Sequence, residues 1–182
     1  MKAVGRMTQA ELAAHVQGHL RNHGITVVLS GGAAVSIYTA NKYVSRDIDL
    51  VNVYSVERRK IRTAMEEIGF RETRRYFHHP ASRHIVEFPP GPLAIDDQPV
   101  RTISRVRFAT GTLRVISATD CVKDRLAAFY FWDDQPSLEQ AVLVAGHKRV
   151  RMAEVRAWSR RLGMLPKFEA FLQRITYGRQ RP

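Results

Sequence analysis

The chain has little of what stabilises secreted proteins or anchors membrane proteins. Cys121 is the only cysteine among 182 residues, which excludes an intrachain disulfide and a cysteine-rich zinc site. No apolar run approaches the roughly 20 residues that cross a bilayer. Residues 1–17 also lack the continuous apolar core of a secretory signal. We therefore expect a cytoplasmic protein without a membrane partner.

Acidic residues are also scarce relative to basic ones. The chain has 29 Lys and Arg against 17 Asp and Glu, which gives a net charge of +12. Arginine dominates, and its guanidinium group is suited to bidentate contacts with phosphate. A field of this sign attracts nucleotides and nucleic acid. The alternative is a basic surface that serves only solubility.

The order of elements predicts an α+β fold. With 45% hydrophobic residues the chain has a globular composition. Hydrophobic periodicity and turn residues predict helices at 8–23, 33–38 and 55–68 and strands at 25–29, 47–53, 71–77, 83–88, 102–108 and 112–116. Four further helices are predicted at 119–132, 137–145, 152–162 and 167–175. We therefore divide the chain into a mixed-sheet domain, 1–117, and a helical C-terminal region, 118–182, and expect the basic tail at 178–182 to fray.

Two short motifs in the first domain indicate phosphate and metal chemistry. Asp47 and Asp49 are two residues apart on a predicted strand, so they project from the same face. Paired carboxylates repel each other unless a cation lies between them, and an all-oxygen pair suits Mg²⁺. Gly31 and Gly32, at the end of the preceding strand, let the backbone and the next helix N-terminus approach a triphosphate. A turn glycine pair beside a solvent-facing strand is the alternative.

These motifs resemble those of the nucleotidyltransferase superfamily related to DNA polymerase β. The matching residues are Leu29-Ser30-Gly31-Gly32 and Asp47-Ile48-Asp49, and residues 33–46 form a slightly longer connection than is common. The resemblance implies a mixed sheet with flanking helices, an NTP substrate and a Mg²⁺ site at Asp47 and Asp49. It also implies that Ser30, Gly31 and Gly32 contact the nucleotide, with Ser45 or Arg46 as further contacts.

A third carboxylate is expected from a later strand. Glu87 is the best candidate, because it lies on an apolar strand just before the break at Pro89-Pro90. Asp96 and Asp97 compete with it but follow the break, which indicates a loop. An outward-facing Glu87 with no catalytic role is the alternative.

The start of the C-terminal region supplies candidate cations. The sequence Asp120-Cys121-Val122-Lys123-Asp124-Arg125 resembles the lysine-bearing helix of toxin nucleotidyltransferases of the abortive-infection (AbiEii) group. That resemblance implies that Lys123 reaches the nucleotide phosphates and that Arg125 assists it or forms an ion pair. Motifs further along the chain do not align with that group, which weakens the substrate assignment.

The resulting hypothesis is a Mg²⁺-dependent transfer of a nucleoside monophosphate from an NTP to an acceptor. The charge favours RNA, in particular tRNA, and the AbiEii resemblance implies a toxin–antitoxin or defence setting with a cognate antitoxin. One alternative is a catalytically silent module that binds RNA or protein. Another is a protein or small-molecule (antibiotic) nucleotidyltransferase, whose cationic substrate would need a locally acidic pocket.

Overall fold

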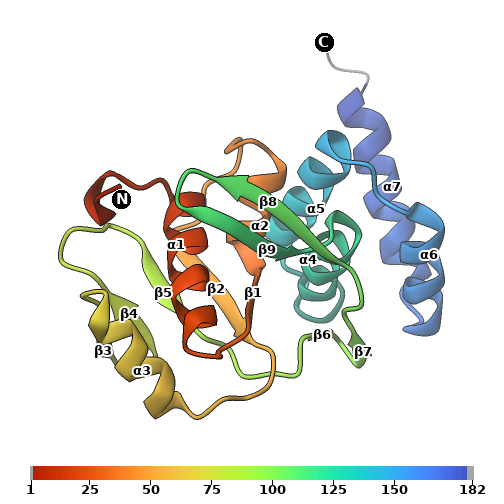
Figure 1. The fold of residues 1–182 in the computed structure, drawn as a ribbon. Coiled ribbons are helices and arrows are strands. Elements are labelled where there is room, and N and C mark those ends of the chain that lie inside the picture. Colours follow the sequence, from red (N-terminus) through yellow and green to blue (C-terminus); the bar gives the residue numbers. More distant parts are fainter. Residues whose placement is uncertain (1, 180–182) are drawn as a thin grey trace.

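The expected α+β class is confirmed in a computed structural model that describes residues 2–179. Within these residues, a mixed seven-stranded sheet is accompanied by seven α-helices (Figure 1). The strands of this sheet are β1 (Val27–Ser30), β2 (Asp47–Asn52), β3 (Arg71–Thr73), β4 (Tyr76–His78), β5 (Ile85–Glu87), β8 (Ile103–Phe108) and β9 (Gly111–Ile116). The helices are α1 (Gln9–Asn22), α2 (Gly31–Tyr38), α3 (Arg58–Glu67), α4 (Ala118–Trp132), α5 (Gln135–His147), α6 (Met152–Arg161) and α7 (Leu165–Arg179).

The sheet has its earliest strands at the centre. Its order is β3-β4-β5-β2-β1-β9-β8. β1 pairs antiparallel with β2 and parallel with β9, whereas β2 pairs parallel with β5. The ends of β1 and β9 and the starts of β2 and β5 therefore lie along one edge of the sheet. This edge therefore brings together residues from four separate parts of the sequence.

Helices cover both faces of the central strands. α1 packs on β1 and β9, and α2 packs on β1 and β2. The first three residues of β1 are consequently all buried, whereas β2 alternates between half-buried and buried side chains. Thr8 and Glu11 form a capping box at the start of α1. Gly24 takes a left-handed conformation after that helix, with φ of 72°.

The structure corrects two predicted elements. The single strand expected at 71–77 is a tight hairpin, β3 and β4, because the chain turns at Arg74, which has φ of 59°. The helix expected from Ser55 begins at Arg58 instead. The side chain of Asn52 holds a turn there by accepting from the Val56 N–H and donating to the Val56 carbonyl.

The helical half follows the last strand directly. Ser117 caps α4 by accepting a hydrogen bond from the Asp120 N–H. α4 and α5 pack against each other and against α2, and Figure 1 shows α6 and α7 on the side of the molecule farthest from β3. β6 (Ala94–Ile95) and β7 (Gln98–Pro99) form a small separate hairpin. α7 continues to Arg179, and the last three residues of the tail expected to fray lie outside the described range.

Across residues 2–179, none of the helices combines the length and apolar character needed to cross a bilayer.

Candidate active site

Three carboxylates lie on neighbouring strands near the end of β1, the start of β2 and the end of β5. The register places Asp49 beside Glu87 of β5 on one side and beside Ser30 of β1 on the other. Asp47 lies two residues earlier on the same face of β2, and both aspartates are half-buried. The intervening Ile48 is fully buried against the core. The structure thus brings together Asp47, Asp49 and Glu87, which are also the expected metal ligands.

Asp49 is the most perturbed acid of this group. Burial, followed by the negative charges of Glu87 and Asp47, raises the pKa of Asp49 to about 6. Arg125 on α4 acts in the opposite direction. Asp49 is therefore held in an environment that penalises its charge, as expected for a carboxylate that faces a cation in its working state.

Gly31 explains why a glycine stands directly beside this acid. Its φ is 63°, and an added Cβ would collide with a carboxylate oxygen of Asp49. At Gly32 an added Cβ would lie only 3.0 Å from Ser45 Oγ and 3.3 Å from the Tyr43 hydroxyl. The glycine pair thus allows the first turn of α2 to lie against β2 and the loop that precedes it.

The start of α2 has no side-chain cap. Ser30 occupies the N-cap position, yet its side chain makes no capping hydrogen bond. The first N–H groups of a helix have no partner within the helix and attract negative charge. Ser30, Gly31 and Gly32 therefore present both a hydroxyl and helix N–H groups next to Asp49.

Ser45 and Arg46 have different surroundings. The Ser45 hydroxyl donates to the Asp47 carbonyl at 3.1 Å, and the Ser45 N–H donates to Ser36 Oγ at 3.0 Å. Ser45 therefore shapes the loop at the start of β2. Arg46 is exposed. The predicted nucleotide contacts of both residues stay predictions.

Gln9 supports the site although no feature of the sequence indicates this role. Its buried amide donates to the carbonyl oxygens of Ser45, at 2.9 Å, and Asp47, at 3.3 Å. These bonds tie the first turn of α1 to the start of β2. A glutamine at the start of an amphipathic helix has the same pattern as a surface residue, so only the tertiary structure reveals this role.

Arg125 is the cation of α4 that acts on Asp49. It pairs with the neighbouring Asp124 at 2.6 Å and also donates to Gln140 at 3.4 Å. Burial alone would lower the pKa of Arg125, but Asp124 and, with a smaller effect, Asp49 raise it above its ordinary value. Both alternatives from the sequence are thus compatible with its position, because Arg125 forms an ion pair and also lies near the carboxylates.

Lys123 has partners away from the carboxylates. It is buried, and its Nζ lies 2.5 Å from Glu154 of α6 and 3.8 Å from Asp120. It lines a pocket of about 460 Å³ between α4, α6 and the β6–β7 hairpin, together with Arg101 and Arg151. The three carboxylates do not line this pocket. The nucleotide contact expected for Lys123 is therefore still a prediction, and its observed contacts join two helices.

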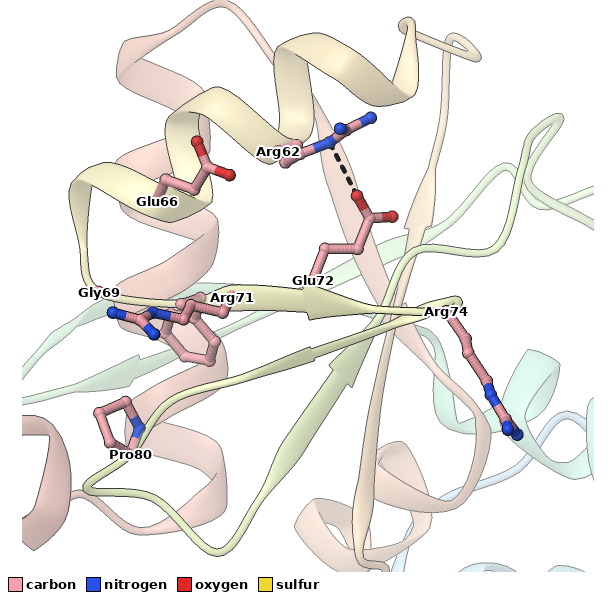
Figure 2. Close-up of a pocket in the computed structure, with 8 residues that line it drawn as sticks. Arg62, Glu66, Gly69, Arg71, Glu72, Arg74 and Pro80 are labelled. Atoms are coloured by element: carbon pink, nitrogen blue, oxygen red, sulfur yellow. Dashed lines mark ion pairs between the residues drawn. The ribbon is translucent and has the colours of Figure 1, made fainter.

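The arginines of the β3–β4 hairpin do not form one cluster. Figure 2 shows Arg71 and Arg74 at opposite ends of β3, around a pocket of about 940 Å³. Arg62 of α3 forms an ion pair there with Glu72 at 2.8 Å. Only Arg75 approaches the carboxylates, because its guanidinium lies 3.3 Å from Glu87. Arg75 is therefore the hairpin residue with a direct connection to the site.

The competing acids are placed elsewhere. Asp96 and Asp97 form the turn of the β6–β7 hairpin, and both pair with Arg161 of α6. The structure agrees with the loop expected after the proline break.

Comparisons with known proteins identify the fold. No family model matches the sequence, and no curated protein matches it either. Solved structures do match. The lincomycin-bound lincosamide antibiotic adenylyltransferase LnuA aligns with a TM-score of 0.54 and 18% identity, over 78% of this chain and 99% of its own. The antibiotic-resistance factor ANT(2″)-Ia, in a solution structure, aligns with a TM-score of 0.51 and 18% identity, over 86% of this chain and 94% of its own.

A second structure of ANT(2″)-Ia, in complex with adenylyl-2″-tobramycin, aligns with a TM-score of 0.52 and 16% identity, over 92% of this chain and 99% of its own. The chain has a nucleotidyltransferase fold. These alignments extend over the sheet and into the helical half, so this fold includes both parts of the chain. They do not test the nearer resemblance to AbiEii-type toxins, which stays a prediction.

Proposed function

We propose that this protein transfers a nucleoside monophosphate from an NTP to a hydroxyl group of an acceptor. The observation that carries the proposal is the position of Asp49, pressed against Gly31 and flanked by Asp47 and Glu87. Carboxylates arranged in this way lower the stability of the folded chain unless a cation offsets their repulsion. A catalytically silent module that binds RNA or protein has no physical need for such an arrangement.

The donor set fits a magnesium ion. Asp47, Asp49 and Glu87 offer only oxygen atoms, and Mg²⁺ is usually held by one or two carboxylates together with phosphate oxygens. Burial and the two neighbouring acids raise the pKa of Asp49, so a bound cation would reduce the cost of its negative charge. When bound, Mg²⁺ would neutralise charge that develops on the phosphate and orient the attacking and leaving oxygens.

The other groups of the site bind the triphosphate and handle a proton. The N–H groups at Gly31 and Gly32 and the Ser30 hydroxyl would bind phosphate oxygens, with Arg125 as the nearby positive charge. Glu87, on the strand next to Asp49, would accept the proton of the acceptor hydroxyl. Arg75 forms an ion pair with Glu87 and would help to hold that carboxylate in position. Pyrophosphate would then leave.

A small-molecule acceptor is favoured over tRNA. The structural neighbours are described with lincomycin and with adenylyl-2″-tobramycin, and each is covered almost completely by this chain. The three carboxylates also make the site locally acidic, which a cationic acceptor needs. RNA remains the second candidate because the net charge is +12. A toxin–antitoxin setting and a cognate antitoxin belong to that second candidate.

The test is transfer of label from each of the four α-labelled NTPs in the presence of Mg²⁺. Tobramycin, lincomycin and total tRNA are offered as separate acceptors. Asp47→Asn/Asp49→Asn is the inactive variant, and Glu57→Gln, which removes an exposed carboxylate outside the site, is the matched control. We expect labelled small molecule with the wild type and Glu57→Gln only.

Two other outcomes would contradict transfer to a small molecule. If label appears on tRNA and disappears in the double variant, the acceptor is RNA and not a small molecule. If the protein binds RNA but transfers label to no acceptor, and the double variant binds RNA equally well, the enzymatic proposal is wrong. The binding module would then be favoured.

A further inference from the structure

Two histidines and a glutamate converge at the far end of α1 from the carboxylate site. His19 lies in the last turn of α1 and His23, four residues later, is the C-cap residue of that helix, so both side chains lie on the same side and their ring centroids are 4.7 Å apart. Glu67, the last residue of α3, lies 3.0 Å from His23 Nε2 and 3.5 Å from His19 Nε2. All three side chains remain partly exposed. An ion from solution can therefore reach them.

The distances suit a small tetrahedral ion. One ligand atom from each of His19, His23 and Glu67 lies within 4.8 Å of the other two. Around a zinc ion with bonds of about 2.0–2.1 Å, tetrahedral ligand atoms are about 3.3 Å apart. The two measured distances, 3.0 and 3.5 Å, lie on either side of this value. His19 Nε2 also lies 2.8 Å from the Ala64 carbonyl, a contact that an ion bound at Nε2 would displace.

The surroundings select the class of ion. His23 adjoins a small surface pocket that is also lined by Arg59 and Lys60. Beside these positive charges, a hard cation such as Mg²⁺, held by a single carboxylate, would be poorly bound. Imidazole nitrogens instead suit Zn²⁺ and similar transition metals. Two histidines and one carboxylate supply three ligands and leave a fourth position for water.

The cluster is distinct from the carboxylate site. Gln9, in the first turn of α1, bonds to the backbone of Asp47. His19 and His23 lie ten and fourteen residues further along the same helix, which is about 15 and 21 Å at the α-helical rise. We propose that His19, His23 and Glu67 bind one divalent transition-metal ion of the zinc class, which fastens the end of α1 to the end of α3. An ion that binds only the folded chain raises its thermal stability.

The experiment uses the full chain without a purification tag, stripped with EDTA and returned to excess Mg²⁺. Zn²⁺ is then titrated by calorimetry, and retained zinc is counted after dialysis. We expect one retained Zn²⁺ per chain and a higher Tm. His19→Gln/His23→Gln and, separately, Glu67→Gln should weaken binding by more than the 10–100-fold that loss of an outer-shell partner costs. His147→Gln, which removes an exposed histidine of α5, should bind like the wild type.

The result does not depend on the proposed enzymatic activity. Asp47→Asn/Asp49→Asn should retain zinc as the wild type does, whether or not transfer is observed. Absence of retained zinc in the wild type overturns the proposal, as does equal retention in the histidine and wild-type proteins. Zinc lost only from the aspartate variant would place the ion at the carboxylates and also overturn it. Glu67→Gln keeps the test decisive if the histidine variant fails to fold without metal.

Discussion

Gly31 and Asp49 are in such close contact that each restricts which residue can occupy the other position. The backbone of Gly31 takes a conformation that other residues rarely adopt, and it does so where the Asp49 carboxylate leaves no room for a side chain. Asp49, in turn, is pressed between this backbone and two further acids. A change at either residue should therefore affect both stability and activity.

Gly31→Ala should be severely damaging. The added methyl group meets the Asp49 carboxylate and forces an unfavourable φ, so we expect a loss of about 2–4 kcal/mol of unfolding free energy. Transfer activity should fall at least 100-fold. Gly18→Ala is the matched control, since nothing lies within 4 Å of its added Cβ on α1. It should stabilise the protein by about 0.5–1 kcal/mol. Thermal unfolding and the labelled-NTP assay measure both effects, and equal behaviour of the two variants would contradict the argument.

The pKa of Asp49 makes a separate prediction for the metal-free protein. Because this pKa is raised from 3.8 to about 6, the folded state binds more protons than the unfolded state between these pH values. The contribution of Asp49 to the free energy of unfolding is therefore present at acidic pH. It declines as the pH rises from about 4 to about 6 and is absent at pH 7. Asp49→Asn removes the penalty and should stabilise the protein at pH 7 by up to about 3 kcal/mol.

Urea unfolding in EDTA at pH 4 and pH 7 measures this difference, which should shrink at the lower pH. Glu57→Gln, at an exposed carboxylate, should change stability by no more than about 0.5 kcal/mol at either pH. An Asp49→Asn protein less stable than the wild type at pH 7 would show that the carboxylate is not strained.

At the scale of elements, the central strands were predictable and the accessory ones were not. β1 and β2 carry strong apolar patterns bounded by Gly31 and by the Asp47–Asp49 motif, so both their existence and their facing side chains follow from the sequence. The β3–β4 hairpin turns at Arg74 in a left-handed conformation that usually belongs to glycine or asparagine, and no turn signal marks it. Glu87 could be nominated from its strand, but its pairing with Asp49 depends on β5 lying parallel to β2, which is a tertiary contact.

The junction of α4 and α6 gives a prediction about Lys123. Lys123→Met and Glu154→Gln each break the same ion pair, and we expect both to lower stability by about 1–3 kcal/mol. The folded fractions should keep similar transfer activity, because Lys123 lies in a pocket that the carboxylates do not line. Steady-state kinetics on both variants is the measurement. A selective rise in KM for the NTP in Lys123→Met would instead establish the phosphate contact implied by the sequence resemblance.

The net charge of +12 of the whole molecule attracts polyanions such as RNA, whereas the acidic site favours a small cationic acceptor. Binding of a polyanion releases counterions, so retention of total RNA should weaken steeply between about 50 and 200 mM salt. Transfer to a small acceptor involves few phosphate contacts outside the site and should change by less than about threefold over the same range. Filter binding and the labelled-NTP assay, run in parallel, separate these behaviours. Transfer that declines with salt as steeply as RNA retention would favour an RNA acceptor.

The strand order has a consequence for the growing chain. β1 and β2 occupy the centre of the sheet, yet their outer neighbours β5 and β9 are synthesised only later, from Ile85 and from Gly111. Until then the antiparallel pair has two bare edges, each able to recruit a strand from another chain. Slow translation between residues 52 and 111 would therefore prolong an aggregation-prone interval, and soluble yield should depend on how quickly a ribosome crosses this stretch.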